Sequence, residues 1–264
     1  MYWLQKRLLS QNFLVNRELV EQLVRDAGID KNDTVLEIGP GRGIITEQLV
    51  KVANHVIAVE KDIELSQRLP KWHNLTLIKG DFLDTPLPFG QYKVFTNPPF
   101  SITGEIIRKL LQSANPPRSI NMVAQNEAAS KFIIHPGSNT MAAILYYPFW
   151  DLKIIHRFQR SDFSPQPRVD SVLVHIQPRT TPWVSVAQKA LYQDFVAYHF
   201  THDRLAKFVP PSKWLQLFKT ASPSLLKTVS GAFNRLNHEQ RGLHKIHRTR
   251  TNPNGRGILN PCSV

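Results

Sequence analysis

The chain has almost no cysteine: Cys262 is the single one among 264 residues. One cysteine excludes an intramolecular disulfide, a Cys-x-x-Cys zinc site and a disulfide framework, and it indicates a reducing compartment. The ten histidines show no His-Glu-x-x-His pattern or other metal-ligand spacing. We therefore expect no metal site.

Long apolar runs are also missing. No stretch approaches the length of a membrane span, and residues 1–10 contain no apolar core of the kind found in secretory signals. Hydrophobic residues make up 42% of the chain and charged residues 20%, which is typical of folded globular proteins. We expect a cytoplasmic protein with no membrane partner, and a monomer by default.

Acidic residues are scarce relative to basic ones. The chain has 33 Lys and Arg against 20 Asp and Glu, a formal net charge of +13 and a pI near 10.0. Residues 201–264 alone contain eleven basic and two acidic residues. Such an excess indicates a polyanionic partner such as nucleic acid. A merely solvated basic surface and an anionic membrane are alternatives, although no amphipathic basic helix or lipidation motif supports the membrane.

Short runs rich in β-branched residues alternate with longer helical patterns along the first two thirds of the chain. The runs cover residues 34–38, 55–59, 75–78, 92–95, 120–124, 152–155 and 171–176. This alternation predicts an α/β fold with a largely parallel sheet of seven strands, which binds ligands at the carboxyl ends of its strands. A proline-bearing loop without a helix joins the last two runs, so they could pair antiparallel at an edge.

The residue pattern of the sequence changes after Gln177. Prolines punctuate the chain there, and helical patterns follow over residues 184–200, 212–219 and 224–233. We predict three parts. They are a main α/β domain over residues 1–178, a small helical RNA-binding domain over 179–240 and a basic, disordered tail over 241–264 that also binds RNA.

A glycine-rich turn follows the first predicted strand, in the segment Glu37-Ile38-Gly39-Pro40-Gly41-Arg42-Gly43. Gly39 and Gly41 allow a tight turn and close approach of the backbone to a ligand at a helix N-terminus. The spacing is G-x-G-x-G with a preceding acid, which favours a methyltransferase over a dinucleotide-binding enzyme. Glu37 would either face a positive group of the cofactor or orient the glycine loop.

Two acidic residues lie at the ends of the next two predicted strands. Glu60 follows Gly39 by 21 positions, where a carboxylate accepts hydrogen bonds from both hydroxyls of a ribose. Asp81 follows the third strand, in position to accept from an adenine amino group. Together with the glycines, these acids predict a nucleoside cofactor site, against the alternative of a plain βα turn with solvated acids.

The segment Asn97-Pro98-Pro99-Phe100 ends the fourth predicted strand and matches the [DNS]-P-P-[YFW] pattern of enzymes that methylate exocyclic amino groups of bases. The Asn97 side-chain oxygen and the Pro98 carbonyl can accept the two hydrogens of such an amine. Phe100 would stack on the base, and Phe163 is our candidate for the opposite side. The alternatives are a turn after the strand for this segment and a core position for Phe163.

These motifs together resemble the rRNA adenine N6-methyltransferase family, which includes the Erm macrolide-resistance enzymes and the small-subunit adenine dimethyltransferases. The resemblance spans about residues 10–178. It rests on Gln11-Asn12-Phe13-Leu14, the segment from Glu37 to Gly43, Glu60, Gly80-Asp81, Asn97 to Phe100, and Phe163 to Ser171. It implies a class I, Rossmann-like methyltransferase fold, S-adenosyl-L-methionine as cofactor and rRNA as partner. It also implies cofactor contacts from Asn12, Leu14, Gly39, Glu60, Asp81 and Asn97.

The chain departs from the family at Pro98, where members usually have an aliphatic residue. Pro98 still supplies a carbonyl, so we expect activity to be retained. The segment over 97–103 and the short helical appendage resemble the Erm branch, which implies an adenine of 23S rRNA as target and resistance to macrolides, lincosamides and streptogramin B. Small-subunit (16S) rRNA methylation, DNA adenine methylation and a non-catalytic rRNA-binding factor are the alternatives.

Overall fold

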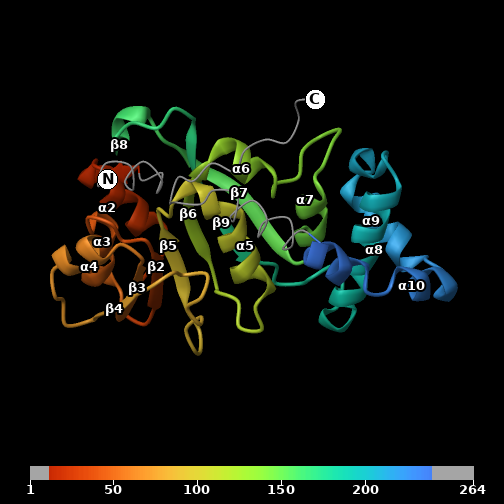
Figure 1. The fold of residues 1–264 in the computed structure, drawn as a ribbon, viewed down its shortest axis with the longest axis horizontal. Helices are drawn as coiled ribbons and strands as arrows, with labels where there is room; N and C mark the ends of the chain where they lie inside the picture. The colour runs from red at the N-terminus through yellow and green to blue at the C-terminus, as the bar shows by residue number, and fades with distance from the viewer. Residues whose placement is uncertain (1–11, 240–264) are drawn as a thin grey trace, which may run out of the picture. The chain divides into compact units, whose positions relative to one another are not determined.

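The computed structural model, drawn in Figure 1, describes residues 12–239 of the chain. The predicted basic tail over 241–264, Gln11 and Cys262 lie outside the described residues. The chain divides into two compact units. Of the described residues, the first contains 12–135 and 146–182, and the second contains 136–145 and 183–239.

A seven-stranded sheet forms the centre of the first unit, as the sequence predicts. Its strands are β2 (Thr34–Ile38), β3 (His55–Glu60), β4 (Leu75–Lys79), β5 (Lys93–Thr96), β6 (Ile120–Gln125), β7 (Trp150–Arg157) and β9 (Ser171–Pro178). They are arranged in the order β4-β3-β2-β5-β6-β9-β7. The first five are parallel, whereas β9 runs antiparallel to both β6 and β7. The predicted antiparallel pair is therefore confirmed, and the last strand in sequence lies inside the sheet while β7 forms the edge.

Helices cover both faces of this sheet. The connection from β2 to β3 runs through α3 (Ile44–Val52), and the connection from β5 to β6 runs through α5 (Thr103–Gln112), in the opposite direction along the sheet. Because such crossovers are right-handed, α3 and α5 lie on opposite faces. α2 (Arg17–Asp26) packs beside α3, and their apolar side chains join the strand residues in one buried cluster. The shorter helices of the chain are α4 (Ile63–Arg68), α6 (Asn126–Ser130) and α7 (Met141–Tyr146).

A two-residue strand pair connects the N-terminal segment to the loop before β9. β1 (Phe13–Leu14) pairs antiparallel with β8 (Phe163–Ser164). The pairing is extended by hydrogen bonds from the Val15 N–H to the Asp162 carbonyl, at 2.9 Å, and from the Asn16 side-chain amide to the Asp162 carboxylate, at 3.0 Å. The N-terminal segment is thereby held against the loop that carries Phe163.

Within the described residues, the second unit contains α8 (Lys189–His202), α9 (Pro211–Lys219) and α10 (Pro223–Val229), close to the predicted helical stretches. Residues 232–239 are helical as well. Tyr192, Phe195, Trp214 and Phe218 pack edge to face at its centre, with ring centroids 5.3 to 6.1 Å apart. Residues 136–145 also belong to this unit, although the predicted main domain included them. The reason is a set of contacts distant in sequence, such as the hydrogen bond from the Tyr192 hydroxyl to the Ile144 carbonyl at 3.0 Å.

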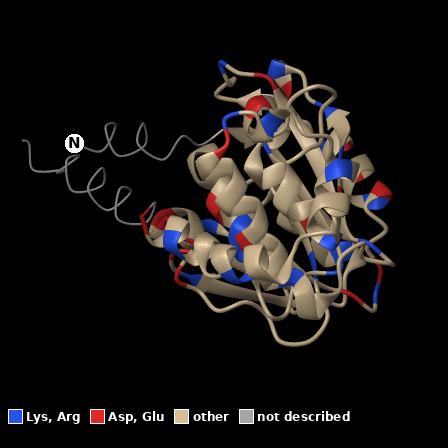
Figure 2. Ribbon diagram, turned by 90° about the vertical axis from the view of Figure 1, so that its right-hand side faces the viewer, with Lys and Arg blue, Asp and Glu red and all other residues tan. Residues whose placement is uncertain are grey.

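The described part of the second unit has a modest excess of positive charge. Residues 183–239 contain seven Lys and Arg against three Asp and Glu. On the side of the molecule drawn in Figure 2, basic and acidic positions are interspersed. Among the described residues, no helix is long and apolar enough to cross a membrane, and no group of three or more His, Cys, Asp or Glu side chains is placed to hold a metal ion.

Lys109 connects α5 to the loop that follows β4. Its ammonium group donates hydrogen bonds to the carbonyls of Phe82, Leu83 and Thr85, at 2.6, 2.9 and 2.5 Å. It also lies 4.7 Å from the centre of the Phe82 ring. All three donors of the ammonium therefore face one loop, and that loop begins at Asp81.

We expect Lys109→Met, which keeps the length of the side chain and removes its donors, to lower the free energy of unfolding by about 1–3 kcal/mol. Urea unfolding of the full chain measures this difference. The control is Lys31→Met, at an exposed lysine. Equal stability of the two variants would contradict a role for Lys109 in holding the loop.

Candidate functional site

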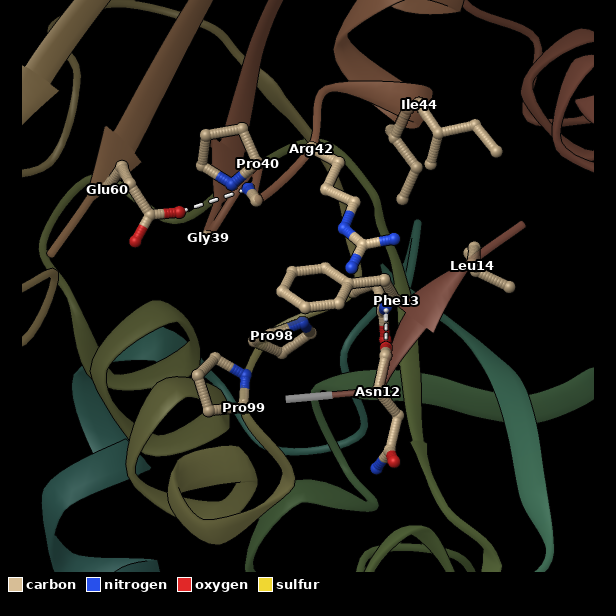
Figure 3. A pocket seen from close by; sticks show the side chains of 13 residues that line it. Asn12, Phe13, Leu14, Gly39, Pro40, Arg42, Ile44, Glu60, Pro98 and Pro99 are labelled. Atoms are coloured by element: carbon tan, nitrogen blue, oxygen red, sulfur yellow. Dashed lines mark hydrogen bonds between the residues drawn. The ribbon is translucent and has the colours of Figure 1, made fainter. Parts of the chain in front are cut away.

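A pocket lies at the carboxyl ends of β2, β3 and β5, where ligands bind in sheets of this kind (Figure 3). It is lined by residues 12–14, 39–42, 44, 45, 60 and 97–99. The structure thus brings together seven of the residues predicted from the sequence: Asn12, Leu14, Gly39, Gly41, Glu60, Asn97 and Pro98. Asp81, Phe100 and Phe163 are not among the described lining residues.

The glycine loop has the left-handed backbone that only glycine adopts without strain. Gly39, Gly41 and Gly43 have φ of 70°, 57° and 83°. A Cβ on Gly41 would lie 2.7 Å from Cε1 of Phe13, so this glycine also makes room for the phenyl ring. The loop is fixed from below by a 3.0 Å hydrogen bond from the Gly41 N–H to the Glu60 carboxylate.

Glu60 lines the pocket, although only 5% of its surface is exposed to solvent. Its second oxygen accepts from the Asp62 N–H at 2.8 Å. Burial raises the pKa of Glu60 above its usual value, and the hydrogen bonds from Asp62 and Gly41 partly oppose this rise. Each oxygen of a carboxylate has two lone pairs, so Glu60 retains acceptor capacity for the hydroxyls of a bound ribose.

Asp81 lies at the end of β4, next to β3, and its carboxylate already has two partners. Lys61 forms an ion pair with it at 2.8 Å, and the Leu83 N–H donates to it at 2.9 Å. The carboxylate is held in place beside the end of β3, at the edge of the sheet where Glu60 also lies. A contact of Asp81 with an adenine stays a prediction.

Asn97, at the end of β5, presents one unsatisfied polar atom. Its side-chain amide nitrogen donates to the Asn12 carbonyl at 2.9 Å. A carbonyl can only accept, so this bond fixes which end of the amide faces Asn12. The other end, Oδ1, is buried and has no hydrogen-bond partner within residues 12–239. A buried acceptor without a partner is costly, and in a pocket it indicates a ligand that donates.

The two predicted stacking aromatics are both buried. Phe100 begins a short 3-10 turn after Pro99 and is 6% exposed. Phe163 is 2% exposed and packs edge to face on Phe158, with ring centroids 5.3 Å apart, inside the core cluster that also contains Leu14. Stacking of either ring on a base requires these side chains to become accessible, and it stays a prediction.

Six of the lining residues were not singled out by the sequence reasoning, and two of these, Phe13 and Arg42, have an aromatic or charged side chain. Phe13 extends into the pocket from β1, and the Arg42 guanidinium lies over its ring, 4.8 Å from the centroid. Together with the other lining residues, these two side chains border the open space of the pocket. Phe13 belongs to the segment Gln11-Asn12-Phe13-Leu14, and Arg42 belongs to the glycine-rich turn. A cation inside such a turn could have indicated a role for Arg42 in ligand binding.

The set of groups in the pocket fits a nucleoside cofactor. The glycine loop supplies a close backbone surface, Glu60 supplies an acceptor for ribose hydroxyls, and Asn97 supplies an orphaned acceptor nearby. The Arg42 side chain is exposed at the mouth, so it can rotate away from the opening as a ligand enters.

Glu37 is a buried carboxyl beneath the glycine loop. It is 1% exposed, and its Oε2 has no hydrogen-bond partner among the described residues. Burial raises the pKa of Glu37 to about 8, to which the nearby Glu60 carboxylate adds while Thr46 opposes it. Glu37 is therefore protonated at neutral pH.

We expect the stability of the protein to fall with increasing pH because of Glu37. The unfolded state loses this proton near pH 4.5, whereas the folded state keeps it to about pH 8. Stability from this group is therefore greatest below pH 4.5 and is lost between these values, by about 1.4 kcal/mol per pH unit at most. Glu37→Gln removes this slope. Urea unfolding between pH 5 and 9 tests the prediction, with the exposed Glu18→Gln as control; equal slopes in wild type and Glu37→Gln would refute it.

Comparison with known families identifies one that covers most of the chain. A family model described as ribosomal RNA adenine dimethylase matches residues 4–206. This range includes every residue assigned above to the pocket.

Curated relatives agree with this match. The chain is 35% identical over 181 residues to the ribosomal RNA small subunit methyltransferase A of Chlorobaculum parvum, covering 66% of each protein. It is 32% identical over 197 residues to an rRNA adenine N-6-methyltransferase of Bacteroides fragilis, covering 73% of each. The alignments with such relatives thus span about two thirds to three quarters of their length.

Solved structures show the same fold. The 23S rRNA methyltransferase ErmE superposes with a TM-score of 0.69 at 24% identity, over 79% of this chain and 98% of that one. A dimethyladenosine transferase from Plasmodium falciparum superposes with a TM-score of 0.65 at 24% identity, over 73% and 72% of the two chains. At this level of identity the likeness concerns the fold alone.

Proposed function

The chain belongs to the ribosomal RNA adenine dimethylase family, whose enzymes use S-adenosyl-L-methionine, and we propose that it methylates the N6 amino group of an adenine in rRNA. One observation carries this proposal. The Asn97 Oδ1 is a buried acceptor without a partner among the described residues, in a pocket built for a nucleoside. Such an atom suits the hydrogen of an exocyclic amine.

The cofactor would be held by the glycine loop and by Glu60. When bound, S-adenosyl-L-methionine supplies an electrophilic methyl group. The left-handed Gly39 and Gly41 let the backbone approach it closely, and Glu60 holds the loop through its bond to the Gly41 N–H while it accepts from the ribose. Asn12 and Leu14 border the site from the N-terminal segment.

Asn97 and Pro98 would prepare the target amine. The lone pair of an adenine amino nitrogen is delocalised into the ring, so the site has to favour a pyramidal nitrogen with a localised lone pair. Asn97 Oδ1 accepts one hydrogen, and the Pro98 carbonyl, which accepts no other hydrogen bond within the described range, takes the second. Fixed acceptors supply this stabilisation without a general base of shifted pKa.

The target base has to leave its stack to reach these groups. We propose that Phe100, directly after Pro99, packs on the extruded base once it becomes accessible. Phe163 is proposed as the opposite surface, since β8 holds its loop against the segment that carries Asn12.

We propose that the target lies in large-subunit rRNA, as in the Erm branch, where methylation confers resistance to macrolides, lincosamides and streptogramin B. The support is the segment over residues 97–103, which resembles that branch. Small-subunit rRNA is the second candidate, favoured by the 35% identity to a small subunit methyltransferase.

The target is tested by transfer of labelled methyl from S-adenosyl-L-methionine to large-subunit rRNA, small-subunit rRNA and DNA in parallel, with the modified base mapped. We expect label on an adenine of large-subunit rRNA. Label on small-subunit rRNA would replace the Erm-type target by the second candidate. Label on DNA alone, or on none of the three, would refute rRNA methylation.

Asn97→Ala tests the proposed chemistry. We expect the transfer rate to fall by about 100-fold or more, because an acceptor preorganised for the transition state is lost, whereas RNA affinity changes little. The exposed Asn54→Ala is the matched control. Unchanged transfer by Asn97→Ala would exclude this role and favour a protein that binds rRNA without modifying it.

A further inference from the structure

Arg42 is the one cation and Glu60 the one anion among the described residues that line the pocket. Figure 3 shows Glu60 on one side of the pocket and the Arg42 side chain reaching over Phe13 on the other. Arg42 makes no ion pair within residues 12–239, although carboxylates are plentiful on this unit. Its guanidinium instead rests on the Phe13 ring at the pocket mouth.

The cofactor assigned under the proposed function has ends of different chemistry. Its ribose donates hydrogen bonds and suits Glu60. Its amino-acid end carries an α-carboxylate, which needs a cation or a group of N–H donors. Glu60 cannot serve that end, because two carboxylates repel each other.

We infer that the Arg42 guanidinium binds the α-carboxylate of S-adenosyl-L-methionine and that Phe13 positions it for this contact. The inference rests on the proposed function. A planar guanidinium presents two parallel donors that match the two oxygens of a carboxylate. The aromatic face beneath it limits the directions in which the fork points.

The surrounding backbone favours the same end of the cofactor. Arg42 directly precedes Gly43, the N-cap of α3, and Ile44 and Ile45 at the start of this nine-residue helix line the pocket. The N-terminus of a helix carries partial positive charge, which adds to that of the guanidinium. Both features place positive potential away from Glu60.

The side chain of Arg42 is exposed, so it can rotate out of the free volume as the ligand enters and still remain at its border. Phe13 is less free to move, because its backbone pairs with β8 and its ring contacts Gly41. The ring therefore supplies a fixed surface on which the guanidinium turns.

The test is a comparison of two ligands by calorimetry with the full chain. S-adenosylhomocysteine contains the α-carboxylate, and its decarboxylated analogue lacks only this group. We expect Arg42→Gln to weaken binding of S-adenosylhomocysteine about tenfold and to leave the analogue unchanged. Arg42→Lys should lie between, since it keeps the charge and loses the fork. Arg118→Gln, at an exposed arginine before β6, is the control and should change neither affinity.

Phe13→Leu tests the positioning role. We expect it to weaken binding of S-adenosylhomocysteine about two- to fivefold, the size of an exposed cation–π contact. When Arg42→Gln is already present, Phe13→Leu should not weaken binding of S-adenosylhomocysteine more than binding of the decarboxylated analogue. An additional selective loss in the double variant would show that Phe13 acts independently of Arg42, and would overturn its assignment.

The outcomes separate the inference from the proposed function. If wild type binds both ligands and Arg42→Gln weakens both equally or neither, the assignment of Arg42 is overturned and the cofactor site stands. If Arg42→Gln changes only the affinity for RNA, the guanidinium serves a phosphate and the assignment is likewise overturned. If wild type binds neither ligand, the proposed function itself fails.

Discussion

The hydrogen bond between the Asn97 side-chain amide and the Asn12 carbonyl is the constraint on which the site depends. It determines which atom of the amide is left free, because a carbonyl can only accept. It also joins the end of β5 to a segment 85 positions earlier in the chain. That segment continues into β1, which pairs with β8. One connected structure therefore contains Asn97, the N-terminal border of the pocket and the loop of Phe163.

Sequence reasoning found the parts of this structure that have local signals. The runs of β-branched residues predicted all seven strands of the sheet, and the glycine, Glu60 and Asn97 motifs were placed where parallel strands end. The pairing of β1 with β8 left no such signal, since two-residue strands have no periodicity. Residues 136–145 belong to the helical unit because of contacts with Tyr192 and Lys207, which are remote in sequence. The burial of Phe100 and Phe163 likewise follows from packing that an aromatic residue in a motif does not reveal.

The pocket keeps groups that a fold selected for stability alone would avoid. Glu37 is buried with an oxygen that lacks a partner among the described residues, close to the carboxylate of Glu60. Burial of this carboxyl is tolerated at neutral pH because Glu37 keeps its proton. Three left-handed residues follow within six positions, and each is glycine. A costly buried carboxyl thus lies directly before a turn that requires glycine, which is the pattern expected where structure serves a ligand.

Chemistry and target selection are separate properties of this chain. The groups that would hold a cofactor and an adenine amine recognise features common to every adenine, so they do not distinguish one rRNA from another. Relatives named as small subunit methyltransferases match this chain over about two thirds of its length. The family model ends at residue 206, before α9 and α10. If the pocket recognises only an adenine amine, as proposed, the choice of target has to depend on how surfaces outside the pocket bind folded RNA.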